Sequence, residues 1–157
     1  MNKHFIPQSI YLEIIKHVPI LCVDVAVRYN GKLLLVKRKH PPFQDEWWTL
    51  GGRVHNREKL ADAAVRKLKE ETNLTSTQLT LIGPYETIFD EEACVFDGGV
   101  HASHTVNILF IAAVEDISML KLDLSSSEYK LFDNIEMNWN PLLKRMITES
   151  KLFDWSI

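Results

Sequence analysis

Apolar residues recur along this chain with two periods, one typical of helices and one typical of strands. Helical spacing, with apolar residues three and four positions apart, is found in residues 9–17, 58–72 and 139–150. Each of these segments also carries polar residues between the apolar ones, as helices that cover one side of a core do. The pattern therefore predicts three amphipathic helices.

The remaining apolar runs predict strands. Two of them flank Asn30-Gly31, a dipeptide that favours the positive φ angles of a type I′ hairpin turn. Further strands are predicted at 78–89, 104–114 and 127–132. Strands and helices in this mixed order predict an α/β fold, with helices packed on a central sheet.

Length and composition fit one globular domain. The chain has 157 residues, of which 46% are hydrophobic and 25% are charged, so we expect a single domain over 1–157. A net charge of -3 argues against a nucleic-acid partner. Two cysteines form no disulfide or zinc framework, and the longest apolar run, ILFIAAV, is far shorter than a membrane span of about 20 residues. The polar N-terminal segment does not resemble a signal peptide, so we expect a soluble, cytoplasmic protein without a membrane partner.

The helix predicted at 58–72 has two distinct faces. At about 100° per residue, Lys67, Glu70 and Glu71 fall on one face, next to Arg66. The opposite, packing side is predicted to contain Ala61, Ala64, Val65, Leu68 and Thr72.

The two glutamates are candidate metal ligands. Mg²⁺ prefers oxygen ligands and takes one or two carboxylates together with water and substrate phosphate, and Mn²⁺ is the alternative cation. Because Gly52 has no side chain, its backbone can approach a cation bound by Glu70 and Glu71. The alternative is a solvated helix face on which Lys67 pairs with the glutamates.

The spacing of the whole segment favours the functional reading. Gly52 is followed by five residues, Glu58, seven residues and RKLKEETNL, which resembles the signature of the Nudix hydrolases. The resemblance implies an α/β/α sandwich with a mixed central sheet, and catalysis that depends on Glu71 and a divalent cation. The matching positions are Gly52, Glu58, Arg66, Leu68, Glu70, Glu71 and Leu74.

Two positions depart from that signature. Asn73 replaces a glycine, a mild change because Asn also adopts the left-handed conformation at helix ends. Lys67 replaces an acid that in most of the family is thought to be a metal ligand or the general base. An ammonium directed at the metal would be repelled by an energy on the order of several kcal/mol. Lys67 must therefore turn away, or its charge takes the place of one metal ion.

The GDP-mannose mannosyl hydrolases, a branch of this family, also lack that acid. The first half of the chain resembles this branch, which is thought to use one magnesium ion and to attack the sugar carbon. The resemblance implies that Asp24, Arg38, Arg53 and Arg66 bind sugar or diphosphate. For Asp24 the alternative is a buried polar residue, and for Arg66 it is a partner that orients one of the glutamates.

The general base of that branch has no equivalent at the same place. The branch carries a catalytic histidine in the loop before the segment that matches SEYKLF, where this chain reads LSSSEYK. The segment 90–104 also contains several acids and two histidines, and long loops are often functional. We therefore predict His104 first, and His101 second, as the base.

Three functions fit these residues. The first is magnesium-dependent hydrolysis of a nucleoside diphosphate sugar, such as GDP-mannose, by attack at the sugar carbon. The second is a nucleotide pyrophosphatase that attacks phosphorus. The third is a Nudix-fold protein that binds nucleotides with weakened catalysis. The partner is in each case a small nucleoside diphosphate derivative, and the resemblance also implies a homodimer.

Overall fold

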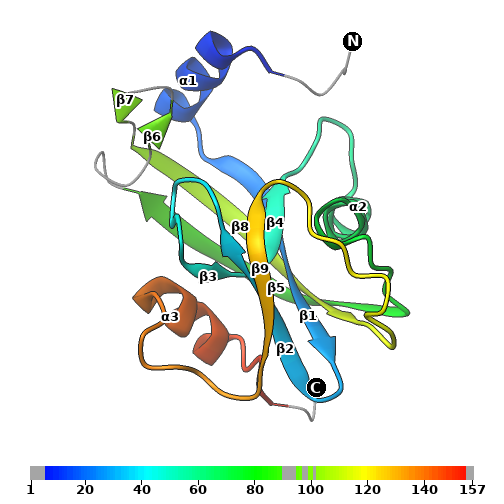
Figure 1. The fold of residues 1–157 in the computed structure, drawn as a ribbon. Coiled ribbons are helices and arrows are strands. Elements are labelled where there is room, and N and C mark those ends of the chain that lie inside the picture. The colour runs from blue at the N-terminus through cyan, green and yellow to red at the C-terminus, as the bar shows by residue number, and fades with distance from the viewer. Residues whose placement is uncertain (1–5, 90–94, 97–98, 101, 155–157) are drawn as a thin grey trace.

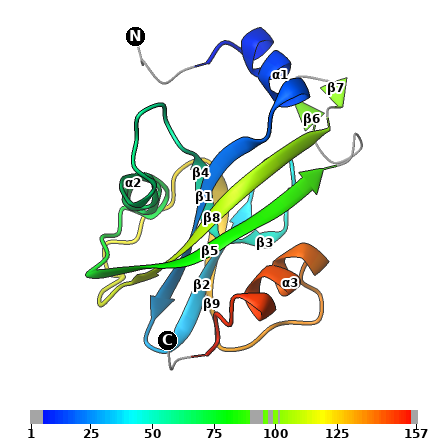
Figure 2. The ribbon, with the colours of Figure 1, turned by 180° about the vertical axis from the view of Figure 1, so that it is seen from behind.

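A central sheet lies between helices α2 and α3, as the two opposite views of the ribbon show (Figures 1 and 2). This computed structural model describes residues 6–89, 95–96, 99–100 and 102–154. The three helices are close to their predicted bounds: α1 Gln8–His17, α2 Leu60–Thr72 and α3 Pro141–Glu149. None of the helices in these ranges is long and apolar enough to cross a membrane.

The sheet is mixed, as predicted for an α/β fold. Strands β3, β2, β1, β8 and β5 follow one another across it, while β4 pairs with β1 and β9 pairs with β2. The β1–β8 pairing is parallel and the other pairings are antiparallel. The strand bounds are β1 Ile20–Tyr29, β2 Lys32–Arg38, β3 Trp47–Trp48, β4 Leu50–Arg53, β5 Gln78–Phe89, β8 Ser103–Ala113 and β9 Ser126–Phe132. A separate hairpin is formed by β6 Val95–Phe96 and β7 Gly99–Val100.

Two turn predictions are confirmed by backbone angles. Asn30 and Gly31 have φ angles of 48° and 69°, as a type I′ turn requires, and they join β1 to β2. Asn73 ends α2 with φ 60° and ψ 8°, so it adopts the left-handed conformation that the signature glycine would otherwise supply.

The predicted packing face of α2 is partly wrong. Ala64, Leu68 and Thr72 are buried, but Val65 is 50% exposed and Ala61 is also exposed. The buried surface is rotated around the helix, so that Ala63 and Glu71 are buried instead. A helical wheel cannot show which neighbouring elements cover the helix, and here β4 and β1 both contact it.

Alternation along β1 separates the two faces of the sheet. Val23, Val25 and Val27 pack in the core on the α2 side. Ala26, which points to the other face, packs in a second core with α3. Asp24 lies on the same face as Ala26, because strand residues two positions apart point the same way. A buried carboxylate is thus placed on the α3 side of the sheet.

Candidate active site

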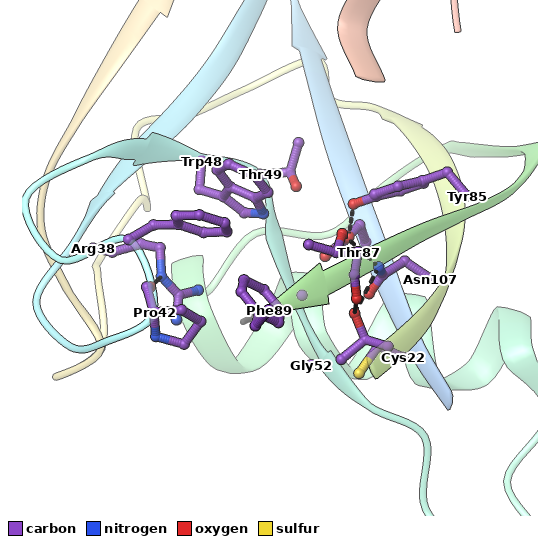
Figure 3. Close-up of a pocket in the computed structure, with 14 residues that line it drawn as sticks. Cys22, Arg38, Pro42, Trp48, Thr49, Gly52, Tyr85, Thr87, Phe89 and Asn107 are labelled. Atoms are coloured by element: carbon purple, nitrogen blue, oxygen red, sulfur yellow. Dashed lines mark hydrogen bonds between the residues drawn. The ribbon is translucent and has the colours of Figure 1, made fainter. Parts of the chain in front are cut away.

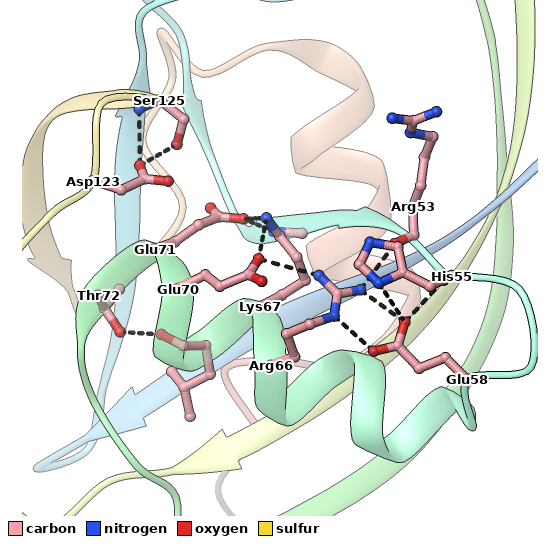
Figure 4. A network of polar contacts seen from close by, with 12 residues as sticks. Arg53, His55, Glu58, Arg66, Lys67, Glu70, Glu71, Thr72, Asp123 and Ser125 are labelled. Atoms are coloured by element: carbon pink, nitrogen blue, oxygen red, sulfur yellow. Dashed lines mark hydrogen bonds and ion pairs between the residues drawn. The ribbon is translucent and has the colours of Figure 1, made fainter. Parts of the chain in front are cut away.

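Helix α2 and strand β4 meet at a buried carboxylate. Glu71 is 6% exposed, and its Oε1 accepts a hydrogen bond from the backbone N–H of Gly51 at 3.2 Å. Lys67 Nζ lies 2.8 Å from Glu71 Oε1 and 3.5 Å from Glu70 Oε2 (Figure 4). Of the two alternatives for Lys67, this geometry favours the second, because its ammonium faces both carboxylates and does not turn away from them.

The charge balance at Glu71 favours a positive partner. Burial raises the pKa of Glu71, and the negative charge of Asp123 raises it further. The Lys67 ammonium and the Gly51 N–H act in the opposite direction and stabilise the carboxylate. A buried carboxylate in this environment gains from any cation that approaches it.

The neighbouring residue Arg66 forms a different network. Its Nε lies 2.6 Å from Glu58 Oε1, and its NH2 donates to Glu58 Oε2 at 2.8 Å and to the carbonyl of Arg53 at 3.1 Å. NH1 donates to Glu70 at 3.1 Å. The hydrogen bonds from Arg66 lower the pKa of Glu58 to about 2. These contacts match the alternative of an orienting partner, and substrate binding by Arg66 stays a prediction.

Two glycines of β4 separate this network from the other side of the strand. A Cβ on Gly51 would lie 2.0 Å from Asp24 Oδ1 and 2.6 Å from the carbonyl oxygen of Val23. A Cβ on Gly52 would lie 3.1 Å from the Cε of Lys67. The backbone therefore passes between Asp24 on one side and Lys67 on the other, with room for hydrogen only at Gly51.

A cavity of about 220 Å³ opens on the Asp24 side (Figure 3). Polar residues of β1, β5 and β8 form one part of its wall, and aromatic residues form another. The lining residues are Cys22, Asp24, Arg38, Pro42, Phe43, Trp48, Thr49, Gly51, Gly52, Tyr85, Thr87, Phe89, Thr105 and Asn107.

Asp24 lies in this cavity wall, bonded to Tyr85. The Tyr85 hydroxyl donates to Asp24 Oδ2. Burial raises the pKa of Asp24 to about 7, the charge of Glu71 adds to the rise, and Tyr85 and Arg38 oppose it. The influence of Glu71 on Asp24 shows that the cavity and the carboxylates of α2 belong to one electrostatic environment.

The two predicted arginines flank the cavity in different ways. Arg38 lines it, and its Nε donates to the carbonyl of Pro42 at 2.8 Å. The Arg53 guanidinium lies 4.7 Å from the ring centre of Tyr11 in helix α1. Burial raises the pKa of Cys22 in the wall to about 12, and the charges of Arg53 and Lys67 oppose that rise. The charge of Asp24 adds to the rise, so the Cys22 end of the cavity lies between the Asp24 carboxylate and the two cations.

The candidate bases are less well supported by the geometry. His104 belongs to β8 rather than to a loop, and its Nε2 lies 3.4 Å from Glu86 Oε1 on β5. Thr105 and Asn107 line the cavity, so His104, one position away on the strand, points to the opposite face. His101 and the acids at 90–92 and 97 lie outside the described residues.

Sequence reasoning missed Asp123. Its backbone N–H donates to the carbonyl of Glu71 at 3.2 Å, and its half-buried carboxylate accepts from Ser125 N and Oγ. The available signal was its place, just before the serines where the resembling branch carries its base. Tyr85 and Asn107 were missed as well, although polar residues at alternate positions of an otherwise apolar strand can indicate a lined pocket.

The donor set fits a single divalent cation. In the part of the chain that the structure describes, no three histidine, cysteine, aspartate or glutamate side chains gather closely enough to hold a metal by themselves. Glu70 and Glu71, with a backbone carbonyl near Gly52, stay the predicted ligands: they would supply oxygen atoms of the kind that Mg²⁺ or Mn²⁺ prefers, and phosphate and water would complete the set. The Lys67 ammonium already lies 2.8 Å from Glu71 Oε1, where it balances part of the carboxylate's charge.

Comparisons with known proteins agree with this arrangement. A family model described as NUDIX domain matches residues 19–155. The low-salt glycan biosynthesis protein Agl8 of Haloferax volcanii is 28% identical over 142 residues, which are 90% of this chain and 88% of that protein. The ADP-ribose pyrophosphatase of Methanocaldococcus jannaschii is 31% identical over 115 residues, 73% of this chain and 62% of that protein. The MutT NUDIX hydrolase of Burkholderia pseudomallei has a similar fold, with a TM-score of 0.70, 19% identity and coverage of 84% of this chain and 98% of that one.

Proposed function

Because this chain belongs to the Nudix hydrolase family, we propose that it hydrolyses a nucleoside diphosphate sugar in a reaction that requires one divalent cation. The similarity to a glycan biosynthesis protein over most of both chains supports a sugar-containing substrate. The similarity to an ADP-ribose pyrophosphatase supports the wider class of nucleoside diphosphate derivatives.

One observation carries this proposal: the two glycines of β4 lie between the predicted cation ligands and an open cavity. Gly51 donates its N–H to Glu71, and both Gly51 and Gly52 line the cavity. A diphosphate that reaches from the cation at Glu71 to Arg38 in the cavity wall would therefore place its substituent at the cavity.

We assign the metal-binding role to Glu70, Glu71 and the carbonyl near Gly52. When bound, Mg²⁺ would neutralise the charge of the departing diphosphate. Lys67 favours the ionised form of Glu71, against the effect of burial, and would contribute a fixed positive charge next to that diphosphate. This fixed charge supports attack at the sugar carbon. In that reaction the departing diphosphate needs its charge neutralised, but no second cation is needed to activate phosphorus.

The diphosphate and the sugar are bound by residues around the cavity. Arg38 and Arg53 carry guanidinium groups, whose planar fork matches phosphate oxygens. Asp24 faces the cavity interior beside Tyr85 and can accept from a substrate hydroxyl. Arg66 acts on the same site indirectly, because it ties Glu70 to Glu58.

For the general base we retain His104 and His101 and add Asp123. Asp123 is favoured because its backbone N–H donates to the carbonyl of Glu71, which places the segment before β9 against the last turn of α2. Comparison of Asp123→Asn with His104→Gln separates these candidates. The variant that removes the base should lower kcat by about 100-fold or more and should abolish the pH dependence assigned to the base.

The decisive experiment is product analysis. The protein is incubated with GDP-mannose, ADP-ribose and nucleoside triphosphates, with Mg²⁺ and with EDTA. Release of free sugar and nucleoside diphosphate supports the proposal, whereas two phosphate-bearing products support the pyrophosphatase that the relative from M. jannaschii suggests. Binding without turnover would support the weakened, nucleotide-binding alternative. The mass of the same purified protein in solution tests the predicted homodimer. Its recovery from the cytoplasm of the expressing cells tests the predicted location.

A further inference from the structure

The cavity contains a buried hydroxyl group that lacks a protein partner. Thr49 is 3% exposed, and among the described residues its Oγ1 has no hydrogen-bond partner. Figure 3 shows this hydroxyl directed toward the middle of the lining side chains, next to Trp48. An unpaired buried hydroxyl destabilises a folded protein, so a ligand group that bonds to it would gain affinity.

The opposite wall provides further hydroxyl-binding groups. Asn107 Nδ2 donates to Thr87 Oγ1 at 3.3 Å and to Thr105 Oγ1 at 3.0 Å. With both amide hydrogens of Asn107 used, its Oδ1 is the group that can accept from a ligand. The Asn107 Oδ1 is thus an acceptor in addition to the unpaired Thr49 hydroxyl, and both can bond to hydroxyl groups of a ring.

An aromatic surface completes the cavity. Phe43 is stacked on Trp48 with 4.4 Å between ring centroids, and it lies 5.2 Å from the ring of Phe89. The cavity, at about 220 Å³, is smaller than the pockets of roughly 300–1,000 Å³ that take drug-sized ligands. It has room for one ring rather than for a whole nucleoside diphosphate derivative.

The position of the cavity indicates which ring of the substrate it binds. Only the backbone of β4 separates the cavity from Glu71, because Gly51 lines the cavity and donates to Glu71. Arg38, to which we assign the diphosphate, lines the cavity itself, so the ring attached to that diphosphate lies at the cavity. In a nucleoside diphosphate sugar, both ends of the diphosphate are attached to sugars, and the nucleobase follows only after the ribose. The ring next to the diphosphate is therefore a sugar.

We propose that this cavity is a sugar subsite in which the Thr49 hydroxyl bonds to a hydroxyl of the terminal sugar, the one that GDP and ADP lack. The inference rests on the proposed function for the identity of the substrate. It makes Thr49 a residue that determines specificity, and it excludes the nucleobase from the cavity.

The test compares Thr49→Val, which removes only the hydroxyl, with Thr49→Ser, which keeps it. Binding of GDP-mannose, GDP, ADP-ribose and ADP is measured calorimetrically in EDTA, so that the result does not depend on turnover. Thr49→Val should weaken binding of the preferred sugar nucleotide about 5- to 30-fold and leave the nucleoside diphosphate within about twofold. Thr49→Ser should stay within about threefold of the wild type.

Stability provides the second measurement. Thr49→Val removes an unsatisfied buried hydroxyl, so its urea midpoint without ligand should equal or exceed that of the wild type. Thr148→Val is the matched control, because its hydroxyl donates to the carbonyl of Lys144 on α3 and faces solvent. This control should not change the affinity for any of the four ligands.

Three results would overturn the sugar subsite. The first is a wild-type protein that does not distinguish each sugar nucleotide from its diphosphate. The second is a loss of affinity in Thr49→Val that is equal for the sugar nucleotides and the nucleoside diphosphates. The third is a Thr49→Val protein with unchanged affinity for all ligands. Failure to hydrolyse GDP-mannose in the presence of Mg²⁺ would contradict the proposed function alone, since these binding data are obtained without the cation.

Discussion

Arg66 and Lys67 are adjacent on helix α2, but their surroundings give them different tasks. Arg66 contacts Glu58, Glu70 and the carbonyl of Arg53, so its guanidinium is committed to protein acceptors (Figure 4). Among the described residues, the Lys67 ammonium pairs with two carboxylates, one of them deeply buried, and its side chain lies beside Gly52 of the strand that lines the cavity.

The acids that these two cations contact respond in opposite directions. The pKa of Glu58 is lowered to about 2, chiefly by its hydrogen bonds from Arg66. The pKa of Glu71 is raised by burial in spite of Lys67. The first pair fixes the loop before the helix, and the second leaves a carboxylate that still gains from a further cation. Of these two adjacent basic residues, Arg66 thus belongs to a structural network and Lys67 to the candidate active site.

The largest effect is expected at the Lys67 side of this comparison. Glu71→Gln removes the carboxylate proposed to bind the cation, and the hydrolysis rate with Mg²⁺ should fall about 1,000-fold or more, since even loss of an outer partner costs about 10- to 100-fold. The fold should persist, because the neutral amide escapes the cost of burying a charge. Steady-state rates and thermal unfolding measure the two effects.

Glu149→Gln, on the exposed end of α3, is the matched control for this variant and should keep its activity. A Glu71→Gln protein with a wild-type rate and unchanged Mg²⁺ dependence would remove Glu71 from the site.

The wall between the cavity and Lys67 provides the next test. Gly51→Ala would place a Cβ 2.0 Å from Asp24 Oδ1 and 2.6 Å from the Val23 carbonyl, so the unfolding free energy should fall by about 3 kcal/mol or more. Gly31→Ala is the control: it meets no atom within 4 Å but has φ 69°, so only about 1 kcal/mol should be lost.

Chemical denaturation at pH 7 gives both values. Equal losses in the two variants would mean that β4 can shift, and that the close passage of Gly51 beside Asp24 is unimportant.

A smaller and pH-dependent effect is expected on the Arg66 side. Glu58→Gln should destabilise the protein by about 1–3 kcal/mol at pH 7, because it leaves the half-buried Arg66 without its main partner. The folded pKa of Glu58 is depressed to about 2, below an unfolded value of about 4.3. Its contribution is therefore complete above about pH 4.3 and is lost as the pH falls toward 2.

Unfolding of wild type and Glu58→Gln is compared at several pH values between 7 and 2. The difference between the two proteins should shrink on acidification. A difference that stays constant down to pH 2 would show that the Glu58 charge is not what stabilises the loop.

Local signals in the sequence were sufficient for much of the fold. Asn30-Gly31 specifies its turn through the φ angles that only a few residues tolerate, and Asn73 ends α2 for the same reason. The face of α2 was not predictable in this way. Val65 was expected in the core and is half exposed, because the direction from which β4 and β1 cover the helix depends on residues distant in the sequence.

The site shows the same limit. The spacing from Gly52 to Glu71 is a sequence property, and the fold brings Gly51 beside Glu71 and Gly52 beside Lys67. His104 was chosen for its chemistry, but its register in β8 turns it away from the cavity. Asp123 was overlooked because only the fold brings the chain before β9 against the end of α2. Contacts between distant segments, rather than residue types, decide such assignments.

The central claim is that the Lys67 ammonium takes the place of one metal ion beside Glu71. Helix stabilisation explains its presence poorly, because a lysine that precedes glutamate by four residues is the weaker orientation for a helical ion pair. The most direct measurement is calorimetric titration of wild type and Lys67→Glu with Mg²⁺ in the presence of GDP. We predict one bound ion per wild-type chain beyond those bound by GDP alone, and a larger number for Lys67→Glu. Two or more such ions in the wild type, with no increase in the variant, would contradict the claim.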